Sequence, residues 1–290
     1  MIRKVSFKYL VDFFVLLLWT SLVHSQKSPL QIHSSNGQMI HHTYYSLSYS
    51  EEHEQAEWVS YVLNPPFLNG SATRSDDFRM DDKVLTQSAN SGDYLYSGYD
   101  RGHLAPAADM VFSNQSILES FYYSNISPQN PQFNRGGWKK LEAQVRDWGK
   151  SFEIIVVTGG VLLDDGLSSI GKNKVSVPKN FYKIVYAPEM DEMIGFVMPN
   201  QKIYNDILSY STTVDEIERL TGINFFIELA EEQQNQLESK IHLENWVFNA
   251  SAPLENIKTS SSSTQCIATT KKGKQCQRKA TSGRKYCWRH

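Results

Sequence analysis

The chain has 290 residues, of which 40% are hydrophobic and 12% aromatic, so it is long enough to bury a core of ordinary size. Charged residues make up 21% and the formal net charge is −2 at pH 7, which argues against intrinsic disorder and against a uniformly cationic polyanion-binding protein. Three cysteines are too few for a disulfide-dense scaffold, and the sequence has no heptad pattern or internal repeat.

The near-neutral total conceals an uneven distribution of charge. Residues 265–290 hold eight Lys or Arg and no Asp or Glu, whereas residues 26–264 hold 18 basic and 30 acidic residues. The middle of the chain is therefore near −12 and the tail near +8. Such a division indicates separate functions for the two parts.

Residues 1–25 have the features of a signal peptide. Arg3, Lys4 and Lys8 provide a positive start, an apolar run covers 13–19, and small residues at 23–25 offer a cleavage site. An uncleaved membrane anchor is the alternative, but the apolar run is shorter than the ~20 residues that a spanning helix needs. We expect an exported protein, periplasmic or secreted, with no membrane span after signal cleavage.

The first chemically notable segment is Asp100-Arg101-Gly102-His103. Histidine is the side chain best suited to proton transfer near neutral pH, and arginine keeps its charge and recognises phosphate oxygens in a flat, bidentate manner. A lone tetrapeptide of this kind is more often a surface turn with an ion pair. The segment alone therefore does not establish catalysis.

Two polar runs follow, NISPQN at 125–130 and NRGGWKKLE at 134–142. The amide oxygen of Asn134 suits a hard, hydrated cation such as Mg²⁺. Alternatively, Asn134 caps the N-terminus of the next helix, because Asn is a favoured cap. Apolar residues at helical spacing predict that helix between 134 and 150, with one buried stripe made of Trp138, Leu141, Val145 and Trp148.

The remaining pattern predicts strands and one short helix. Ile154–Thr158 is a β-branched run that Gly159 and Gly160 should end, and 181–186 with 193–198 should form a hairpin around the loop 187–191. The sequence 213–216 is a capping box that should open a helix ended by Gly222. Strands and helices without regular βαβ alternation predict an α+β fold.

The motifs 100–108 (DRGHLAPAA), 125–129 (NISPQ) and 134–142 (NRGGWKKLE) closely resemble those of the DNA/RNA non-specific endonucleases, the family of secreted sugar-non-specific nucleases and of endonuclease G. The resemblance continues at 44–61, 78–81 and 213–225, and it covers about 40–248. It implies a ββα-metal (His-Me finger) nuclease fold with a mixed, mainly antiparallel sheet core.

The resemblance also implies roles for individual residues. His103 would be the general base and Asn134 the only direct protein ligand of one Mg²⁺ or Mn²⁺ ion. Arg101 would stabilise charge on the phosphate, Asn125 would help to orient the site, and Arg74 is the candidate for a second family arginine. Glu142 would bind the water shell of the metal: on an unbroken α-helix, eight residues separate it from Asn134 by about 12 Å and roughly 80°.

The implied activity is hydrolysis of phosphodiester bonds in DNA and RNA, leaving 5′-phosphate ends. Alternatives are a catalytically inactive nucleic-acid-binding protein of the same fold, and a phosphodiesterase acting on a small ester. Arg101, Arg135, Lys139 and Lys140 could form a basic cleft in the acidic body, although for the two lysines a solvated helix face is favoured. DNA and RNA are the expected partners, and a homodimer is a candidate assembly.

The organisation that we expect is a signal peptide (1–25), an endonuclease domain (26–248), a polar linker (249–264) and a basic module (265–290). The module holds all three cysteines in the pattern C-x9-C-x10-C-x2-H, made by Cys266, Cys276, Cys287 and His290. Three thiolates and an imidazole would complete a structural Zn²⁺ site, whereas one disulfide and a free thiol is the alternative for an exported protein. The ligand count favours zinc. The eight basic residues favour a nucleic-acid tether, and binding to a cell-surface polyanion or to a partner protein is the alternative.

Overall fold

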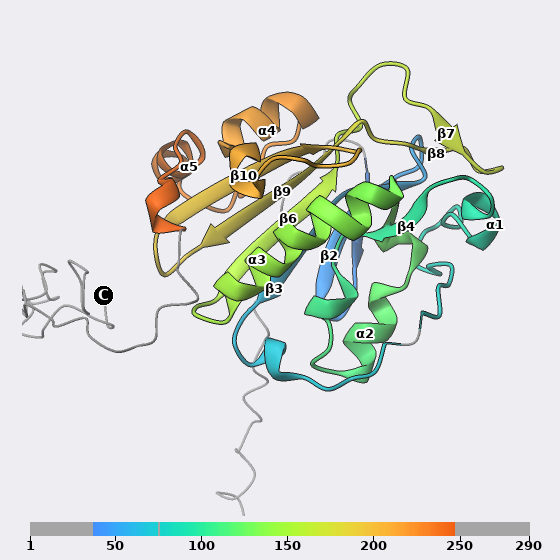
Figure 1. Cartoon of the computed structure of the whole chain (residues 1–290), viewed down its shortest axis with the longest axis horizontal. Coiled ribbons are helices and arrows are strands. Elements are labelled where there is room, and N and C mark those ends of the chain that lie inside the picture. Colours follow the sequence, from blue (N-terminus) through green and yellow to red (C-terminus); the bar gives the residue numbers. More distant parts are fainter. Residues whose placement is uncertain (1–36, 75, 247–290) are drawn as a thin grey trace, which may run out of the picture. The chain divides into compact units, whose positions relative to one another are not determined.

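The computed structural model describes residues 37–74 and 76–246. The predicted signal peptide, linker and basic module, with Cys266, Cys276, Cys287 and His290, lie outside these residues. Figure 1 shows helices packed around a large sheet in the described part of the chain. Helices and strands alternate irregularly along the chain, which confirms the expected α+β class.

In the described residues, seven strands form the main sheet, and each neighbouring pair is antiparallel (Figure 1). Their order in the sheet is β1-β2-β3-β6-β9-β10-β11. The strands are β1 (Gln38–His41), β2 (Tyr45–Ser50), β3 (Gln55–Leu63), β6 (Ile154–Gly160), β9 (Asn180–Ala187), β10 (Glu192–Pro199) and β11 (Ser211–Thr212).

Two small strand pairs and several helices complete the described part. The paired strands are β4 (Asp100–His103) with β5 (Ile126–Gln129), and β7 (Ser169–Ile170) with β8 (Val175–Ser176). The α-helices are α1 (Ser91–Tyr94), α2 (Asn114–Ser120), α3 (Lys139–Gly149), α4 (Val214–Thr221) and α5 (Glu231–Glu238). A π-helix, Phe133–Trp138, runs directly into α3, and short 3-10 turns cover Phe67–Asn69, Ala107–Asp109, Tyr123–Asn125, Ile207–Tyr210 and Leu243–Asn245.

The predicted strand at 154–158 is the buried centre of the sheet, but it does not end at the glycines. Gly159 and Gly160 continue β6 and pair with Tyr182 and Phe181 of β9. A Cβ atom on Gly159 would lie 2.2 Å from the carbonyl oxygen of Glu57. Glycine is therefore used here for close approach of a neighbouring strand rather than for a turn.

The predicted hairpin and the predicted short helix are both confirmed. β9 and β10 pair along their whole length, from Asn180 opposite Pro199 to Ala187 opposite Glu192. Thr213 Oγ1 accepts the hydrogen bond of the Glu216 amide at the start of α4. Gly222 ends the helix with φ +70°, a left-handed conformation that glycine adopts without steric cost.

Successive residues of β6 face two different hydrophobic clusters, because strand side chains alternate between the sheet faces. Val156 belongs to the cluster that contains the helix stripe predicted from the sequence, Trp138, Leu141, Val145 and Trp148, which is fully buried. Val157 belongs to the second cluster, with Val214 and Ile217 of α4. The sheet thus separates the π-helix and α3 from α4 and α5 (Figure 1).

Among the described residues, no helix is long and apolar enough to cross a membrane.

Candidate active site

The DRGH segment forms β4 and pairs antiparallel with β5, which carries most of the NISPQ run. Asp100 lies opposite Gln129, and His103 lies opposite Ile126. Gly102 permits this pairing, because a Cβ atom there would lie 2.2 Å from the Gln129 side chain. Helical backbone begins at residue 131, directly after β5. The order strand, strand, helix therefore places His103 and Asn134 on one ββα unit.

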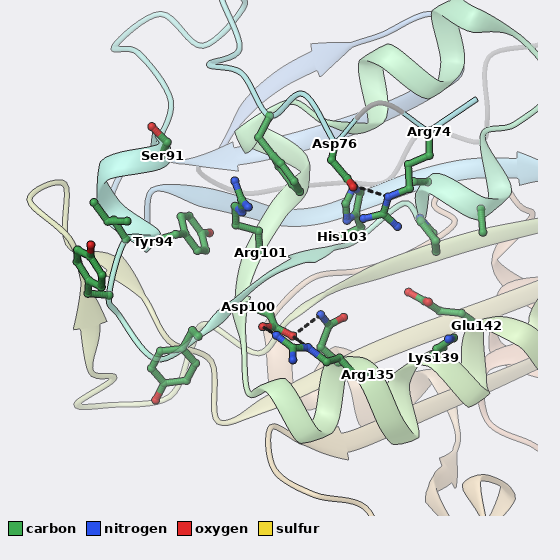
Figure 2. A pocket seen from close by; sticks show the side chains of 18 of the residues that line it. Arg74, Asp76, Ser91, Tyr94, Asp100, Arg101, His103, Arg135, Lys139 and Glu142 are labelled. Carbon is green, nitrogen blue, oxygen red and sulfur yellow. Dashed lines mark hydrogen bonds and ion pairs between the residues drawn. The ribbon is translucent and has the colours of Figure 1, made fainter. Parts of the chain in front are cut away.

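A cleft of about 780 Å³ lies between the strand pair and this helix. Figure 2 shows Arg74, Asp76, Arg101 and His103 along one side, and Arg135, Lys139 and Glu142 along the helix that faces them. Five of the six residues predicted from the motifs for the catalytic centre line the cleft, namely Arg74, Arg101, His103, Asn134 and Glu142. Segments far apart in the sequence thus meet at one surface.

Asn134 does not cap the helix. Its amide donates to the carbonyl oxygen of Asn130, so it already lies inside the helical turn, and Asn130 Oδ1 accepts the amide hydrogen of Gln132 in front of it. The Asn134 side chain instead donates from Nδ2 to Asp100 Oδ2, at 2.9 Å. Because a carboxylate can only accept, Oδ1 of Asn134 is directed away from Asp100 and is free to act as a ligand.

Asp100 has a second partner in Arg135. The guanidinium donates from Nε to Oδ2 at 2.8 Å and from Nη2 to Oδ1 at 2.5 Å, a bidentate arrangement. The Arg135 side chain is 73% exposed, whereas that of Asp100 is 14% exposed. Asp100 is therefore held firmly in place, and it fixes the orientation of the Asn134 amide.

His103 is half-buried at the end of β4. Its ring lies against two aromatic rings, with centroids 5.5 Å from Phe78 and 4.9 Å from Phe121. Its Nε2 atom is buried and has no hydrogen-bond partner among the described residues. Burial, together with the positive charges of Arg74 and Arg101, lowers the pKa of His103 to about 3, while the charge of Asp76 opposes them. The imidazole is therefore neutral at physiological pH.

The two arginines of the cleft are positioned differently. Arg101 lies over the ring of Phe78, with its Cζ 4.1 Å from the centroid, a cation–π geometry. Arg74 donates from Nε to Asp76 Oδ1 at 2.5 Å, and its side chain is 57% exposed. Both guanidinium groups line the cleft that His103 lines. An anionic group in the cleft would therefore meet two permanent positive charges.

Asn125 does not line the cleft. It is fully buried, and its side chain makes three hydrogen bonds: Oδ1 accepts from the Ala105 amide at 2.8 Å, and Nδ2 donates to the carbonyl oxygens of Ala105 and Ser120 at 2.9 and 2.8 Å. These contacts hold the chain that leaves His103. Any influence of Asn125 on the cleft is therefore exerted through the backbone.

Glu142 lies on α3 and faces the cleft (Figure 2). The separation expected between Asn134 and Glu142 assumed an unbroken α-helix. Residues Phe133–Trp138 form a π-helix with i→i+5 bonds instead, so the expected rotation around the helix axis does not apply. Burial raises the pKa of Glu142 to about 7, and the positive charge of Lys183 is the largest opposing influence. Burial in turn lowers the pKa of Lys183 to about 8.

Lys183 was not anticipated from the sequence. It is fully buried in β9, and its Nζ lies 4.8 Å from the centre of the Trp138 ring, with no hydrogen-bond partner among the described residues. A charged residue in an otherwise apolar strand run is the signal that could have identified it. Asp109 and Arg146, joined at 2.7 Å, and Lys139 are the other charged groups that influence Glu142.

The two lysines after Trp138 differ in position. Both are exposed, as expected for a solvated helix face, but Lys139 lines the cleft and Lys140 is absent from its lining. Arg135 also lines the cleft. Together with Arg74 and Arg101, these residues provide the local positive charge that the acidic body lacks.

A strand pair that carries a histidine, followed by a helix that carries an asparagine ligand, defines the ββα-metal class of nucleases. A sequence profile of the DNA/RNA non-specific endonucleases matches residues 27–232, and the chain belongs to this family. It is therefore a nuclease, a hydrolase of nucleic acids.

Individual relatives agree with this assignment. The chain is 35% identical to the mitochondrial nuclease EXOG of Danio rerio over 236 residues, which cover 75% of this chain and 69% of the relative. It is 33% identical to a nuclease of Nostoc sp., over 75% of this chain and 83% of the relative. The crystal structure of the EndoG/EndoGI complex contains a similar chain with a TM-score of 0.64 and 31% identity, covering 69% of this chain and 90% of that chain.

Proposed function

We propose that this protein is an exported, Mg²⁺-dependent endonuclease that hydrolyses both DNA and RNA and leaves 5′-phosphate ends. The observation that supports it best is the meeting of His103 and Asn134 in one cleft that Arg74 and Arg101 also line. A neutral imidazole, a free amide oxygen and two fixed positive charges are the groups that phosphodiester hydrolysis needs.

The donor set of the cleft fits a hard, hydrated cation. Oδ1 of Asn134 is a neutral oxygen ligand held in orientation by Asp100, and Glu142 lies on the same helix as a partner for metal-bound water. Mg²⁺ is the preferred ion and Mn²⁺ a substitute. When bound, the ion would neutralise charge on the phosphate and on the leaving sugar oxygen.

His103 would act as the general base. Because its Nε2 is buried, Nδ1 is the ring nitrogen that can meet a water molecule in the cleft. It would take one proton from that water, whose oxygen attacks phosphorus while the bond to the 3′-oxygen breaks. The leaving 3′-oxygen would take a proton from solvent water and become a 3′-hydroxyl. Arg101 would stabilise the phosphate charge that develops. Since water attacks, no ribose 2′-hydroxyl is required, and both DNA and RNA are substrates.

The test is digestion of plasmid, single-stranded DNA and RNA by the full chain with Mg²⁺, Mn²⁺ or EDTA. We expect His103→Ala and Asn134→Ala each to lose at least ~10²-fold in rate, the scale of a lost general base. Both should still bind DNA, because the arginines remain. Lys140→Ala, an exposed change outside the cleft lining, is the matched control and should cut normally.

Normal digestion by His103→Ala would overturn the assignment of the base, and full activity in EDTA would overturn metal dependence. End chemistry is read separately: products with 5′-phosphates are ligated directly, whereas 5′-hydroxyl ends require prior phosphorylation. Ligation only after phosphorylation would contradict the proposed bond cleavage.

For the basic module we propose a structural Zn²⁺ bound by Cys266, Cys276, Cys287 and His290, which tethers nucleic acid. The ligand count and the eight basic residues support it. Metal analysis of the full chain should find one zinc per chain, lost in Cys276→Ser. Deletion of 259–290 should weaken DNA binding and flatten its salt dependence while leaving the chemical step unchanged. An unchanged salt slope would contradict the tether.

Export and assembly have direct tests. Cleavage after residue 25 predicts a mature N-terminus at Gln26, which mass spectrometry of the exported protein would identify. Retention in the cell with an intact N-terminus would contradict export. Sedimentation of the purified chain would measure its mass in solution. A homodimer predicts twice the mass of the mature chain, and the mass of a single chain would contradict it.

A further inference from the structure

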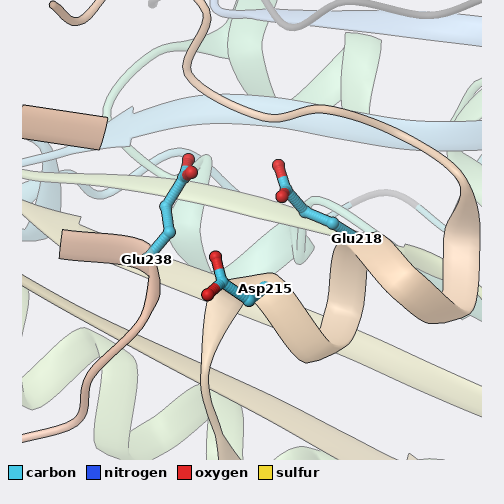
Figure 3. Close-up of side chains that lie close together, drawn as sticks. All are labelled: Asp215, Glu218 and Glu238. Carbon is cyan, nitrogen blue, oxygen red and sulfur yellow. The ribbon is translucent and has the colours of Figure 1, made fainter. Parts of the chain in front are cut away.

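Three carboxylates from two helices meet outside the catalytic cleft. Asp215 and Glu218 come from α4, and Glu238 is the last residue of α5. One oxygen from each lies within 4.8 Å of the others. Figure 3 shows the three side chains pointing toward a common space between the two helices. None of them lines the cleft that holds His103.

The innermost carboxylate has no partner for one of its oxygens. Glu238 is only 3% exposed, and its Oε1 is buried without a hydrogen-bond partner among the described residues. Glu218 is half-buried and accepts the Phe225 amide hydrogen at 2.7 Å through one oxygen, while Asp215 is exposed. The cluster is thus closed at Glu238 and open to solvent at Asp215. An orphaned buried acceptor is costly, and it points to a missing positive group.

No basic side chain of residues 37–74 or 76–246 forms an ion pair with this cluster. The arginine on α4, Arg219, is already held by Glu216 through two hydrogen bonds of 2.8 and 2.7 Å. Burial, together with the negative charges of Glu218 and Asp215, raises the pKa of Glu238 to about 8, while a hydrogen bond from Gln234 opposes them. The three carboxylates therefore need a proton or a cation in order to remain together.

We propose that Asp215, Glu218 and Glu238 bind a divalent cation, Ca²⁺, that joins α5 to α4. Oxygen ligands with no nitrogen or sulfur select a hard ion. Ca²⁺ takes oxygens at about 2.3–2.6 Å in irregular geometry, so two of its ligands can be up to about 5 Å apart, as the cluster allows. Mg²⁺ requires a smaller, near-octahedral shell, and it more often uses one or two carboxylates with several waters.

The ion has a structural role. α5 buries only Leu237 and Glu238, and no side chain caps its N-terminus. Hydrogen bonds from Gln233 and Gln234 join it to Asp191, Asn224 and Phe225. With the ion bound, the repulsion of three carboxylates becomes attraction between the two helices. The segment after the sheet would then be held against α4 and β10 without any change in the catalytic cleft.

The test uses the full chain with Asn134→Ala, so that the proposed ligand in the cleft is absent. Thermal unfolding is followed in EDTA, in CaCl₂ and in MgCl₂, with calorimetric titration of Ca²⁺. We expect a hundredfold excess of Ca²⁺ over its Kd to raise Tm by roughly 5–10 °C, with a smaller effect of Mg²⁺. Asn134→Ala/Glu238→Gln should lose this shift. Asn134→Ala/Glu232→Gln, which removes a charge from the exposed part of α5, should keep it.

Misfolding is distinguished from a lost site by the measurement in EDTA. Because Glu238→Gln removes a buried acid, that variant should unfold in EDTA at the same temperature as its parent or higher. Two results would overturn the proposal: no Tm shift and no heat of binding in the parent up to about 10 mM Ca²⁺, well above the Kd of weak extracellular sites, or an equal shift in the Glu238→Gln variant. Neither depends on whether the cleft cuts DNA.

Discussion

Asp100 accepts the Nδ2 hydrogen bond of Asn134 at 2.9 Å, while Arg135 holds both oxygens of the same carboxylate. The carboxylate thereby decides which end of the asparagine amide faces the cleft. The first residue of the DRGH segment thus orients the proposed metal ligand on the facing helix.

Replacing Asp100 by Asn should weaken metal binding more than it lowers the cleavage rate at saturating Mg²⁺. An amide at this position can present either end to Asn134, so the ligand orientation is no longer enforced. We expect the Mg²⁺ concentration for half-maximal cleavage to rise about 10–100-fold, the usual cost of losing a partner of a metal ligand. Rates over a Mg²⁺ titration measure this. Arg135→Ala, which leaves the Asp100–Asn134 bond intact, should shift the titration far less, and equal shifts in both variants would contradict this account.

Lys183→Met should change the pH dependence of cleavage. The positive charge of Lys183 is the largest influence that lowers the pKa of Glu142, which burial raises to about 7. Without that charge the pKa rises further, so more of Glu142 is protonated at neutral pH. We expect the acid limb of the pH–rate profile to move to higher pH. Lys139→Met removes a charge with a weaker influence on Glu142 and should shift the limb less. An unmoved limb in Lys183→Met would show that Glu142 does not need to be ionised.

Gly102→Ala should destabilise the strand pair that carries His103. The new methyl group would lie 2.2–2.4 Å from three atoms of the fully buried Gln129 side chain. Overpacking of this kind costs about 1–3 kcal/mol in the free energy of unfolding. Denaturant unfolding of Gly102→Ala, Gln129→Ala and the double variant would measure it. We expect the double variant to recover part of the loss, and full additivity would argue against the steric cause.

Glu238 should make the metal-free protein less stable as pH rises. The pKa of this acid is raised from 4.5 to about 8 in the folded state. Between these values the folded chain holds a proton that the unfolded chain has released, so stability falls by at most about 1.4 kcal/mol per pH unit. Unfolding in EDTA across this range, with Glu238→Gln as reference, isolates the effect. The stability difference between the two proteins should grow toward pH 8 and then level off; a constant difference would contradict the raised pKa.

Local patterns in the sequence were sufficient for several elements. The stripe from Trp138 to Trp148 predicted a helix whose apolar face is buried, and the residues at 213 and 222 predicted the start and end of α4. These predictions hold because helical spacing and capping depend on neighbours within a few residues. The same reasoning was wrong at Gly159, where the close approach of another strand, and not a turn, requires glycine.

Which residues come together in the cleft, and which way their side chains point, depended on tertiary structure. The resemblance of the motifs identified His103 and Asn134 in the sequence. Whether Asn134 caps the helix depended on tertiary structure: Asn130 precedes it at the start of the helix, and the Asn134 side chain is bonded to Asp100. The meeting of Asp215 with Glu238 had no local signal, and the charge of Lys183 in an apolar strand run did not indicate that Glu142 lies near it. Periodicity reports which face of an element is buried, whereas contact between distant charged groups depends on how whole elements pack, and no short stretch of sequence contains that information.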